Sequence, residues 1–248
     1  MRLKDGQISL SSSKDKQAYR KLRRLLDKSL DLSGDYWNWP TVGYLTLPTM
    51  QRILNLAWIY DLQIKSSGCI MEFGLHYGSS FAQLINLRSM LEPYNYSRHI
   101  YGFDTFEGFS NTSNKDGLAK EKDFKVQDNY EEHIEKICSI HESFAPKEHM
   151  KKFTLLKGDA ASTLTELLEN RPDLVISLVI FDMDIYKPTK EVLAKIKPRL
   201  HKGSIIVFDE FNSPHFPGET VAAMEELDFK KVEFLQSPYL PFNTIYKF

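Results

Sequence analysis

Five short apolar runs in the second part of the chain constrain its fold most strongly. They show no alternation of apolar and polar residues, which is typical of strands buried on both faces of a parallel sheet. Each run ends in acidic residues or glycine, as strands do where they leave the core. The runs are GCIMEF at 68–73, HIYGFD at 99–104, KFTLLKGD at 152–159, LVISLVIFD at 174–182 and GSIIVFDE at 203–210.

Helical patterns separate these runs and predict helices on both faces of the sheet. After a further helix at 218–227, KKVEFLQ at 230–236 and NTIYKF at 243–248 indicate two more strands. We therefore predict an α/β fold, a Rossmann-like doubly wound sheet of about seven mostly parallel strands with an antiparallel last strand. The separating helical patterns lie at 79–91, 129–143, 161–169 and 189–200.

The first 66 residues have a different pattern and are expected to form an N-terminal helical cap. Residues 14–32 carry apolar side chains at helical spacing with cations on the other faces, which predicts a basic amphipathic helix docked on the protein. This helix is also the predicted contact of a homo-oligomer. An irregular aromatic segment at 34–48 is expected to cover a pocket, and Thr49 to cap the next helix. We expect residues 67–248 to form the core, with the whole chain in one compact domain.

The composition excludes several classes of protein. A net charge of −1 lacks the basic balance of a nucleic-acid binder, so we expect no nucleic-acid partner. The chain has only two cysteines, so we expect no disulfide framework. Its start is polar and no run of about 18 apolar residues occurs, so we expect a cytoplasmic protein with no transmembrane segment.

The acidic residues at the ends of the predicted strands define a candidate site. Ligands of open α/β sheets bind beyond the carboxyl ends of the strands. Because parallel strands end at the same edge, these side chains are expected to share one rim. They are Glu72, Asp104, Asp159, Asp182 and Asp209.

The segment MEFGLHYGSS at 71–80 opens a helix directly after the first predicted strand. Gly74 and Gly78 permit close backbone approach, but they are four residues apart and do not match the dinucleotide pattern G-x-G-x-x-G. About 30 residues later, Asp104 ends the second strand, where a carboxylate can accept from the two hydroxyls of a ribose. Together with Glu72, this arrangement predicts a nucleoside site.

The segments EFGLHYGSS, YGFDTFEGF, LKGDA, VIFDMDIYKPT and GSIIVFDEF resemble the class I S-adenosylmethionine-dependent methyltransferases, most closely the macrocin O-methyltransferase-like group that modifies sugars. The resemblance covers roughly residues 68–226. It implies that Glu72, Gly74 and Gly78 line the methionine part of the cofactor, that Ser79 and Ser80 approach its carboxylate, that Asp104 holds the ribose and that Asp159 approaches the adenine amine. It also places the following residues at the cofactor: Tyr77, Thr105, Phe106, Gly158, Ala160 and Asp182.

Asp182 and Asp184, in the segment FDMD, have two further interpretations. The segment is similar to the first motif of haloacid-dehalogenase phosphatases, although Ile185 and Tyr186 follow it and little chain remains for the other phosphatase motifs. Alternatively, Asp182 gathers with Asp209 and Glu210 of the next strand, and so many carboxylates repel one another unless a cation lies between them. Oxygen ligands favour Mg²⁺ or another hard divalent cation. The resemblance implies that Asp182, Asp209 and Glu210 hold that ion.

We therefore predict a divalent-metal-dependent O-methyltransferase that uses S-adenosylmethionine and acts on a hydroxyl of a sugar, nucleotide sugar or similar polyol. Asp182 and Asp184 are the predicted catalytic residues, and Asp184 is the candidate general base, with His76 and His215 as alternatives. A phosphatase and a cofactor-binding protein without turnover remain open. Substrate contacts are expected from the aromatic segment at 36–44, from the connection 105–127 and from 211–219.

Overall fold

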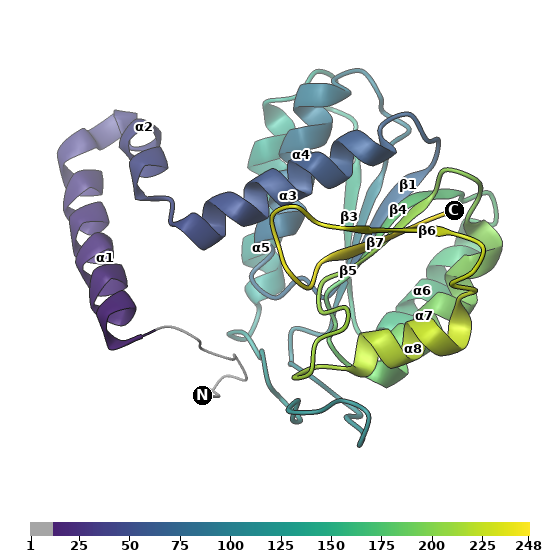
Figure 1. The fold of residues 1–248 in the computed structure, drawn as a ribbon. Helices are drawn as coiled ribbons and strands as arrows, with labels where there is room; N and C mark the ends of the chain where they lie inside the picture. The colour runs from purple at the N-terminus through teal and green to yellow at the C-terminus, as the bar shows by residue number, and fades with distance from the viewer. Residues whose placement is uncertain (1–11) are drawn as a thin grey trace.

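The computed structural model describes residues 12–248. They form a three-layer α/β fold, one sheet between two layers of helices, with an N-terminal helical arm (Figure 1). The seven-stranded sheet has the order β3-β2-β1-β4-β5-β7-β6. The first five strands are parallel, whereas β7 pairs antiparallel with both β5 and β6. The predicted fold class is therefore confirmed. The strands are β1 (Cys69–Phe73), β2 (Ile100–Asp104), β3 (Phe153–Lys157), β4 (Ile176–Phe181), β5 (Ile205–Phe208), β6 (Glu233–Gln236) and β7 (Thr244–Lys247).

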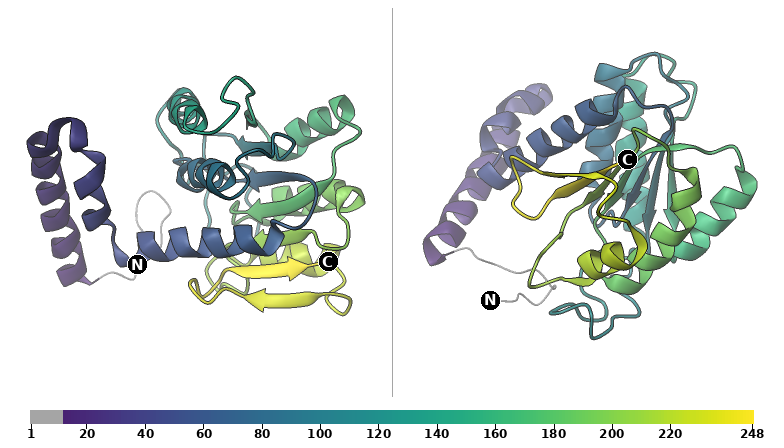
Figure 2. Two further views of the ribbon diagram at one scale, coloured as in Figure 1. Left: turned by 90° about the horizontal axis from the view of Figure 1, so that it is seen from above. Right: turned by 45° about the vertical axis from the view of Figure 1, so that its right-hand side comes forward.

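Helices cover both faces of the sheet, as the left part of Figure 2 shows from above. Neighbouring strand residues face opposite layers: Ile70 packs with α3, α4 and α5, and Met71 packs with α6, α7 and α8. Burial on both sides explains why the strands lack alternation. The helices are α1 (Ser13–Ser33), η1 (Gly34–Tyr36), α2 (Asn38–Thr41), η2 (Val42–Tyr44), α3 (Leu47–Gln63), α4 (Ser79–Leu91), α5 (Tyr130–Ser143), α6 (Ala160–Asn170), α7 (Tyr186–Ile196), η3 (Lys197–Arg199) and α8 (Gly218–Glu226), where η marks a 3₁₀ helix.

The N-terminal part differs from the expectation in three respects. No residue of α1 is buried, so this helix is not docked on its own core. The aromatic segment folds into the short helices η1, α2 and η2 instead of an irregular loop. The side chain of Thr46, not that of Thr49, caps α3, because Pro48 is tolerated within the first helical turn and moves the helix start upstream.

The helix α3 connects this region to the core. Its residues Leu56, Ile59 and Tyr60 belong to the hydrophobic cluster beneath α4. The division at residue 66 between a cap and a core remains a prediction. Within residues 12–248, both cysteines are free and buried, and no helix is long and apolar enough to cross a membrane.

Candidate active site at the carboxyl edge of the sheet

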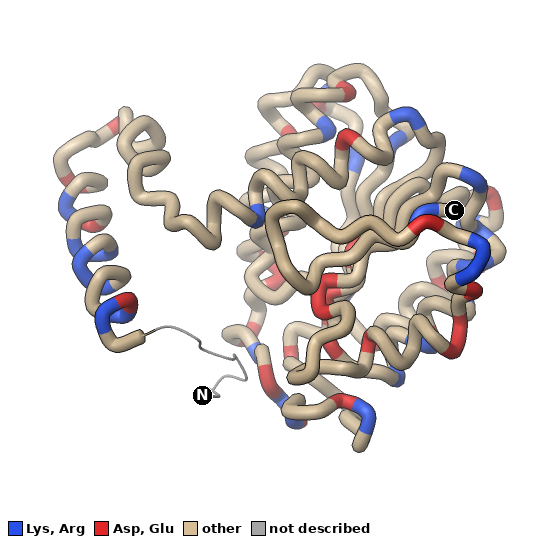
Figure 3. Tube along the Cα trace, viewed as in Figure 1, with Lys and Arg blue, Asp and Glu red and all other residues tan. Residues whose placement is uncertain are grey.

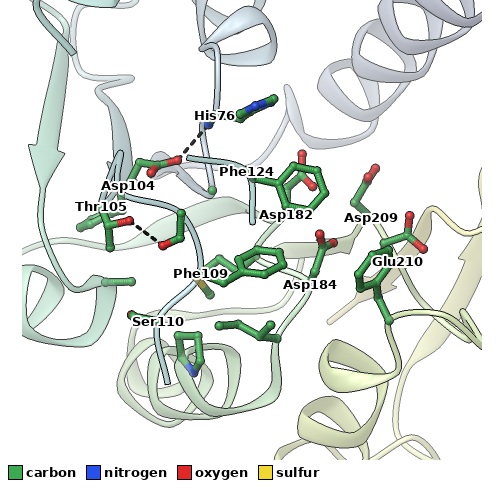
Figure 4. Close-up of a pocket in the computed structure, with 18 of the residues that line it drawn as sticks. His76, Asp104, Thr105, Phe109, Ser110, Phe124, Asp182, Asp184, Asp209 and Glu210 are labelled. Carbon is green, nitrogen blue, oxygen red and sulfur yellow. Dashed lines mark hydrogen bonds between the residues drawn. The ribbon is translucent and has the colours of Figure 1, made fainter. Parts of the chain in front are cut away.

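A cavity of about 570 Å³ lies at the carboxyl edge of the sheet (Figure 4). This volume is in the usual range for small-molecule sites. Most of the predicted residues line it, and they come from the ends of β1, β2, β3, β4 and β5. The predicted residues in its wall are Gly74, His76, Tyr77, Ser79, Asp104, Thr105, Gly158, Asp159, Ala160, Asp182, Asp184, Asp209 and Glu210.

Five predicted residues do not line the cavity. Glu72 is fully buried and Ser80 donates to its Oε1, while Gly78 lies at the start of α4 with φ 71°. Phe106 is buried in the core beneath the turn after β2. His215 is also outside the lining, where its main chain pairs with Leu118.

The glycine turn after β1 is held by backbone geometry that requires Gly74. This residue has φ 91°, and a Cβ atom there would overlap the carbonyl oxygen of Asp182. The turn therefore brings the end of β1 into close contact with the end of β4. As a consequence, the predicted cofactor turn and the predicted catalytic loop form adjacent walls of one cavity.

Asp104 organises the cofactor side of the cavity. Its Oδ2 accepts hydrogen bonds from the backbone N–H groups of Leu75 and His76 at 2.6 and 2.8 Å, and its Oδ1 accepts from the N–H of Phe106 at 2.6 Å. A carboxylate has about four lone-pair sites, so one remains for a ligand. Asp104 thus shapes the glycine turn itself, a role that its position at a strand end did not predict.

Asp159 has a comparable role at the end of β3. Its Oδ1 accepts hydrogen bonds from the N–H and the Oγ–H of Ser162, and through these bonds Asp159 caps the start of α6. Asp159 therefore acts as the N-cap of α6. Its contact with an adenine amine stays a prediction.

Four carboxylates lie together on the opposite side of the cavity, those of Asp182, Asp184, Asp209 and Glu210 (Figure 4). Burial raises the pKa of Asp182 well above its usual value, and the nearby Asp209 and Asp184 add to the rise. Burial also raises the pKa of Asp184, with further contributions from Glu219 and Glu210. Because these groups repel one another, the cluster favours binding of a cation or of protons.

The donors of this cluster fit a hard divalent cation in chemical type, and one of them has an open acceptor. Asp184 has φ 60° and is buried, and its Oδ1 has no hydrogen-bond partner. Asp209 Oδ1 accepts from the amide of Asn243 at 3.0 Å. In the described part of the chain, however, no group of three His, Cys, Asp or Glu side chains is arranged to hold a metal ion. The carboxylate oxygens are therefore the right type of ligand for a hard divalent cation, but in this structure three of them do not converge on a single metal position.

Glu219 is a further acidic residue of the site, and its role was not predicted from the sequence. It is fully buried in the first turn of α8, and its Oε1 accepts from the N–H groups of Met183 and Asp184 at 3.0 and 3.1 Å. Its Oε2 accepts from the N–H of Glu210 at 3.4 Å. Glu219 thereby fixes both acidic loops to each other. The other acidic residues were predicted because they follow strands. Glu219 lies at the start of a helix, so its position did not indicate a role in the site.

Two further residues at or near the site were not predicted individually from the sequence. Arg52 of α3 lines the cavity, and its positive charge partly offsets the rise in the pKa values of Asp182 and Asp184. Asp116, fully buried within the connection 105–127, accepts from the N–H of Tyr186 at 2.5 Å. This bond anchors the connection to the start of α7.

The connection 105–127 supplies apolar parts of the cavity wall. Phe109, Ser110 and Phe124 line the cavity, and the ring of His76 packs edge-on against Phe124 at 5.7 Å between centroids. None of the aromatic side chains of 36–44 lines it, contrary to the expectation that this segment covers the pocket. Contact between the connection and a substrate stays a prediction.

Glu72 gives a prediction of its own, because burial raises its pKa to about 8 from a usual 4.5. Its stabilising contribution is fully present below about pH 4.5 and is lost as the pH rises towards 8, since the folded state must then bury a charge. We expect Glu72→Gln to raise the free energy of unfolding of the cofactor-free protein at pH 8, by up to about 4 kcal/mol. Urea unfolding at pH 5, 6.5 and 8 measures this. The prediction fails if the difference between the two proteins does not change with pH.

The comparisons with known proteins agree with this geometry. The family model for macrocin-O-methyltransferase (TylF) matches residues 4–240. The crystal structure of CalS11, a calicheamicin methyltransferase, is 30% identical, covers 100% of this chain and 99% of its own, and superposes with a TM-score of 0.91. An apo structure of CalS11, described as a TDP-rhamnose 3'-O-methyltransferase, is 29% identical with a TM-score of 0.84 and covers 97% of each chain.

A curated relative from Streptomyces olivaceus is more distant. It is 8-demethyl-8-(2,3-dimethoxy-alpha-L-rhamnosyl)-tetracenomycin-C 4'-O-methyltransferase, and it is 23% identical over 184 residues. The match spans 70% of this chain and 65% of the relative. The family model covers nearly the whole sequence, and the full-length structural match includes the arm as well as the sheet. The chain therefore belongs to the macrocin O-methyltransferase family of S-adenosylmethionine-dependent O-methyltransferases.

Proposed function

We propose that this protein transfers the methyl group of S-adenosylmethionine to a hydroxyl of a sugar, and that it uses a divalent cation to do so. The observation that carries the proposal is the shared cavity, in which the glycine turn and Asp104 face a cluster of four carboxylates. The glycine turn and Asp104 suit a nucleoside, whereas the cluster of carboxylates suits a hydroxylated acceptor. The relatives named for rhamnose-containing substrates support the sugar as the acceptor class.

Cofactor binding is assigned to the side of the cavity formed by β1, β2 and β3. Gly74, Tyr77 and Ser79 would contact the methionine part, Asp104 and Thr105 the ribose, and the turn 158–160 the adenine. Four predicted residues do not line the cavity and would instead support the residues that do; they are Glu72, Gly78, Ser80 and Phe106. Asp182 borders both sides, so it would lie next to the reactive methyl group.

The chemical step consists of one proton transfer and one methyl transfer. Asp184 would take the proton of the acceptor hydroxyl, the hydroxyl oxygen would form a bond to the methyl carbon, and the bond from that carbon to sulfur would break. S-adenosylhomocysteine and the methyl ether are then the products. Fixed in-line orientation of the two reactants supplies on the order of 7–11 kcal/mol, and general-base help about 10²- to 10⁴-fold in rate.

Asp182, Asp209 and Glu210 are the residues that would hold the cation. When bound, a divalent ion lowers the pKa of a hydroxyl and orients neighbouring oxygens. Glu219 would keep the two acidic loops in register through its bonds to Met183, Asp184 and Glu210. Membership of the methyltransferase family disfavours the phosphatase alternative for Asp182 and Asp184.

The proposal is tested with S-adenosylmethionine labelled with ¹³C in the methyl group. We expect a new ¹³C resonance of a sugar O-methyl group after incubation with TDP-rhamnose or a rhamnosylated acceptor. Treatment with EDTA should abolish the signal, and added Mg²⁺ should restore it. Full turnover in EDTA would refute the role of the cation. Hydrolysis of a phosphate ester without methyl transfer would refute the function itself.

A further inference from the structure

One residue of the connection 105–127 is buried beside the loop that carries the predicted base. Charged residues of both signs are distributed along this connection (Figure 3), and most of them are exposed. Asp116, in contrast, is 0% exposed. Burying a carboxylate costs solvation energy unless hydrogen bonds replace the water, so such a residue is expected to have specific partners.

Asp116 accepts hydrogen bonds on both of its carboxylate oxygens. Its Oδ2 accepts from the N–H and the Oγ–H of Ser113 at 2.6 and 2.8 Å, which closes a turn within the connection. Its Oδ1 accepts from the N–H of Tyr186 at 2.5 Å, on the first residue of α7. A carboxylate is favoured at the N-terminus of a helix, where N–H groups lack partners within the helix. Asp116 therefore joins the connection to a position two residues after Asp184.

Buried acidic side chains hold the backbone on both sides of Asp184. Glu219 accepts from the N–H of Asp184 itself, and Asp116 accepts from the N–H two residues later. Between them, the N–H of Ile185 donates to the carbonyl oxygen of Met183 at 2.7 Å. Asp184 has φ 60°, a left-handed conformation that residues other than glycine seldom adopt, so contacts around it must stabilise it. Glu219 and Asp116 supply such contacts.

The packing at Gly218 places the carboxylate of Asp116 against the backbone of Asp184. Gly218 begins α8, and a Cβ atom there would lie 2.5 Å from Asp116 Oδ1 and 2.7 Å from the carbonyl oxygen of Asp184. Both distances are shorter than real contacts of a Cβ atom, so this position has no room for a side chain. A shift of Asp116 would therefore be felt at the main chain of the predicted base.

The same connection also forms part of the cavity wall. Phe109, Ser110 and Phe124 line the cavity together with Asp184 (Figure 4). The Oδ1 atom of Asp184 is buried and accepts no hydrogen bond within the part of the chain that the structure describes, so it is available to an acceptor hydroxyl. One segment thus contributes to the cavity wall and to the support of the base, and a movement of this segment would displace both.

We propose that Asp116 is a positioning residue, which holds Asp184 at the distance and orientation that proton transfer needs. The inference rests on the proposed function, in which Asp184 takes the proton of the acceptor hydroxyl. Asp116 is not among the residues that line the cavity, so it acts indirectly. It acts through the N–H of Tyr186 and the packing at Gly218, and its effect on the rate depends on the carboxylate of Asp184.

Loss of Asp116 is expected to lower kcat with little change in cofactor binding. Asp116→Ala should reduce kcat for methyl transfer by about 10- to 100-fold, since misplacement of a reacting group by about 1 Å has effects of this size. Binding of S-adenosylhomocysteine should stay near wild type. The matched control is Glu225→Ala, which removes an exposed anchor of the same region, where Glu225 accepts from the hydroxyl of Tyr186 and pairs with Lys115. Because this anchor is exposed, the control should keep a kcat near wild type.

A double-mutant cycle with Asp184→Asn distinguishes positioning from general damage. If Asp116 acts through the carboxylate of Asp184, Asp116→Ala should lower kcat less than about threefold further in the Asp184→Asn protein, because the group that it positions is already lost. A structural defect would instead multiply the two losses. Gly218→Ala is a second variant of the same contact, since it keeps every acidic side chain but inserts a methyl group beside Asp116. It should show the same loss and the same non-additivity.

Several outcomes would overturn the positioning role. They are a kcat near wild type in Asp116→Ala and Gly218→Ala, losses that multiply in the Asp184→Asn protein, and a Glu225→Ala protein as slow as Asp116→Ala. Circular dichroism and S-adenosylhomocysteine binding verify folding, and Gly218→Ala carries the test if Asp116→Ala does not fold. A wild-type rate for Asp184→Asn alone would refute the base and this inference with it, whereas multiplied losses refute the positioning role and leave the base intact.

Discussion

Replacing Asp184 by Asn is expected to lower kcat by about 10²- to 10⁴-fold, because the amide cannot accept the proton of the acceptor hydroxyl. The side chain keeps its size, and the backbone N–H of residue 184 can still donate to Glu219. Burial together with Glu219 and Glu210 raises the pKa of Asp184, which increases its affinity for a proton. Methyl transfer at saturating substrate, followed as S-adenosylhomocysteine release, measures the effect.

The controls for this experiment separate a chemical role from a structural one. Binding of S-adenosylmethionine should remain near wild type in Asp184→Asn. Asp173→Asn removes an exposed carboxylate that pairs with Arg171, and it should leave kcat unchanged. A wild-type rate for Asp184→Asn would reject this residue as the base. A large loss of kcat in His76→Gln would then identify the competing candidate.

The variant Glu142→Gln is expected to destabilise the fold by about 3–5 kcal/mol, because it leaves two buried cations without a counter-ion. Glu142 pairs with Arg88 at 2.6 Å and with Lys152 at 2.5 Å, and all three side chains are almost completely buried. Arg88 also donates to the carbonyl of Lys152 at 2.7 Å, so the cluster ties α4, α5 and β3 together. Urea or thermal unfolding measures the loss.

An exposed ion pair on the same helix gives the matched comparison. Glu135 of α5 pairs with Lys151, and both side chains are at least one-third exposed. Because solvent screens such pairs, Glu135→Gln should cost less than about 1 kcal/mol. Equal effects of the two substitutions would contradict the view that burial makes the Glu142 cluster important.

The strand ends were predictable from the sequence because burial on both faces leaves a distinctive pattern. Five continuous apolar runs could be placed as parallel strands, and the parallel arrangement then put Asp104, Asp182 and Asp209 on one edge without any knowledge of their contacts. The same reasoning located the helix after the glycine turn. The pattern of apolar residues and the residue types at the strand ends were sufficient to place these elements.

The residues that escaped prediction act across long sequence separations. Arg52 reaches the cavity from α3, and Glu219 reaches two acidic loops from α8, so neither belongs to a local motif. The amphipathic pattern of residues 14–32 gave the helix correctly but not its surroundings, because periodicity identifies an apolar face without identifying what covers it. Docking on its own core was therefore a wrong expectation.

Calorimetric titration with S-adenosylhomocysteine tests most directly whether the acidic edge of the sheet binds the cofactor. We predict saturable binding of one molecule per wild-type chain, at least tenfold weaker binding to Asp104→Ala, and wild-type binding to Asp173→Ala. The absence of saturable binding to the folded wild-type protein would contradict it.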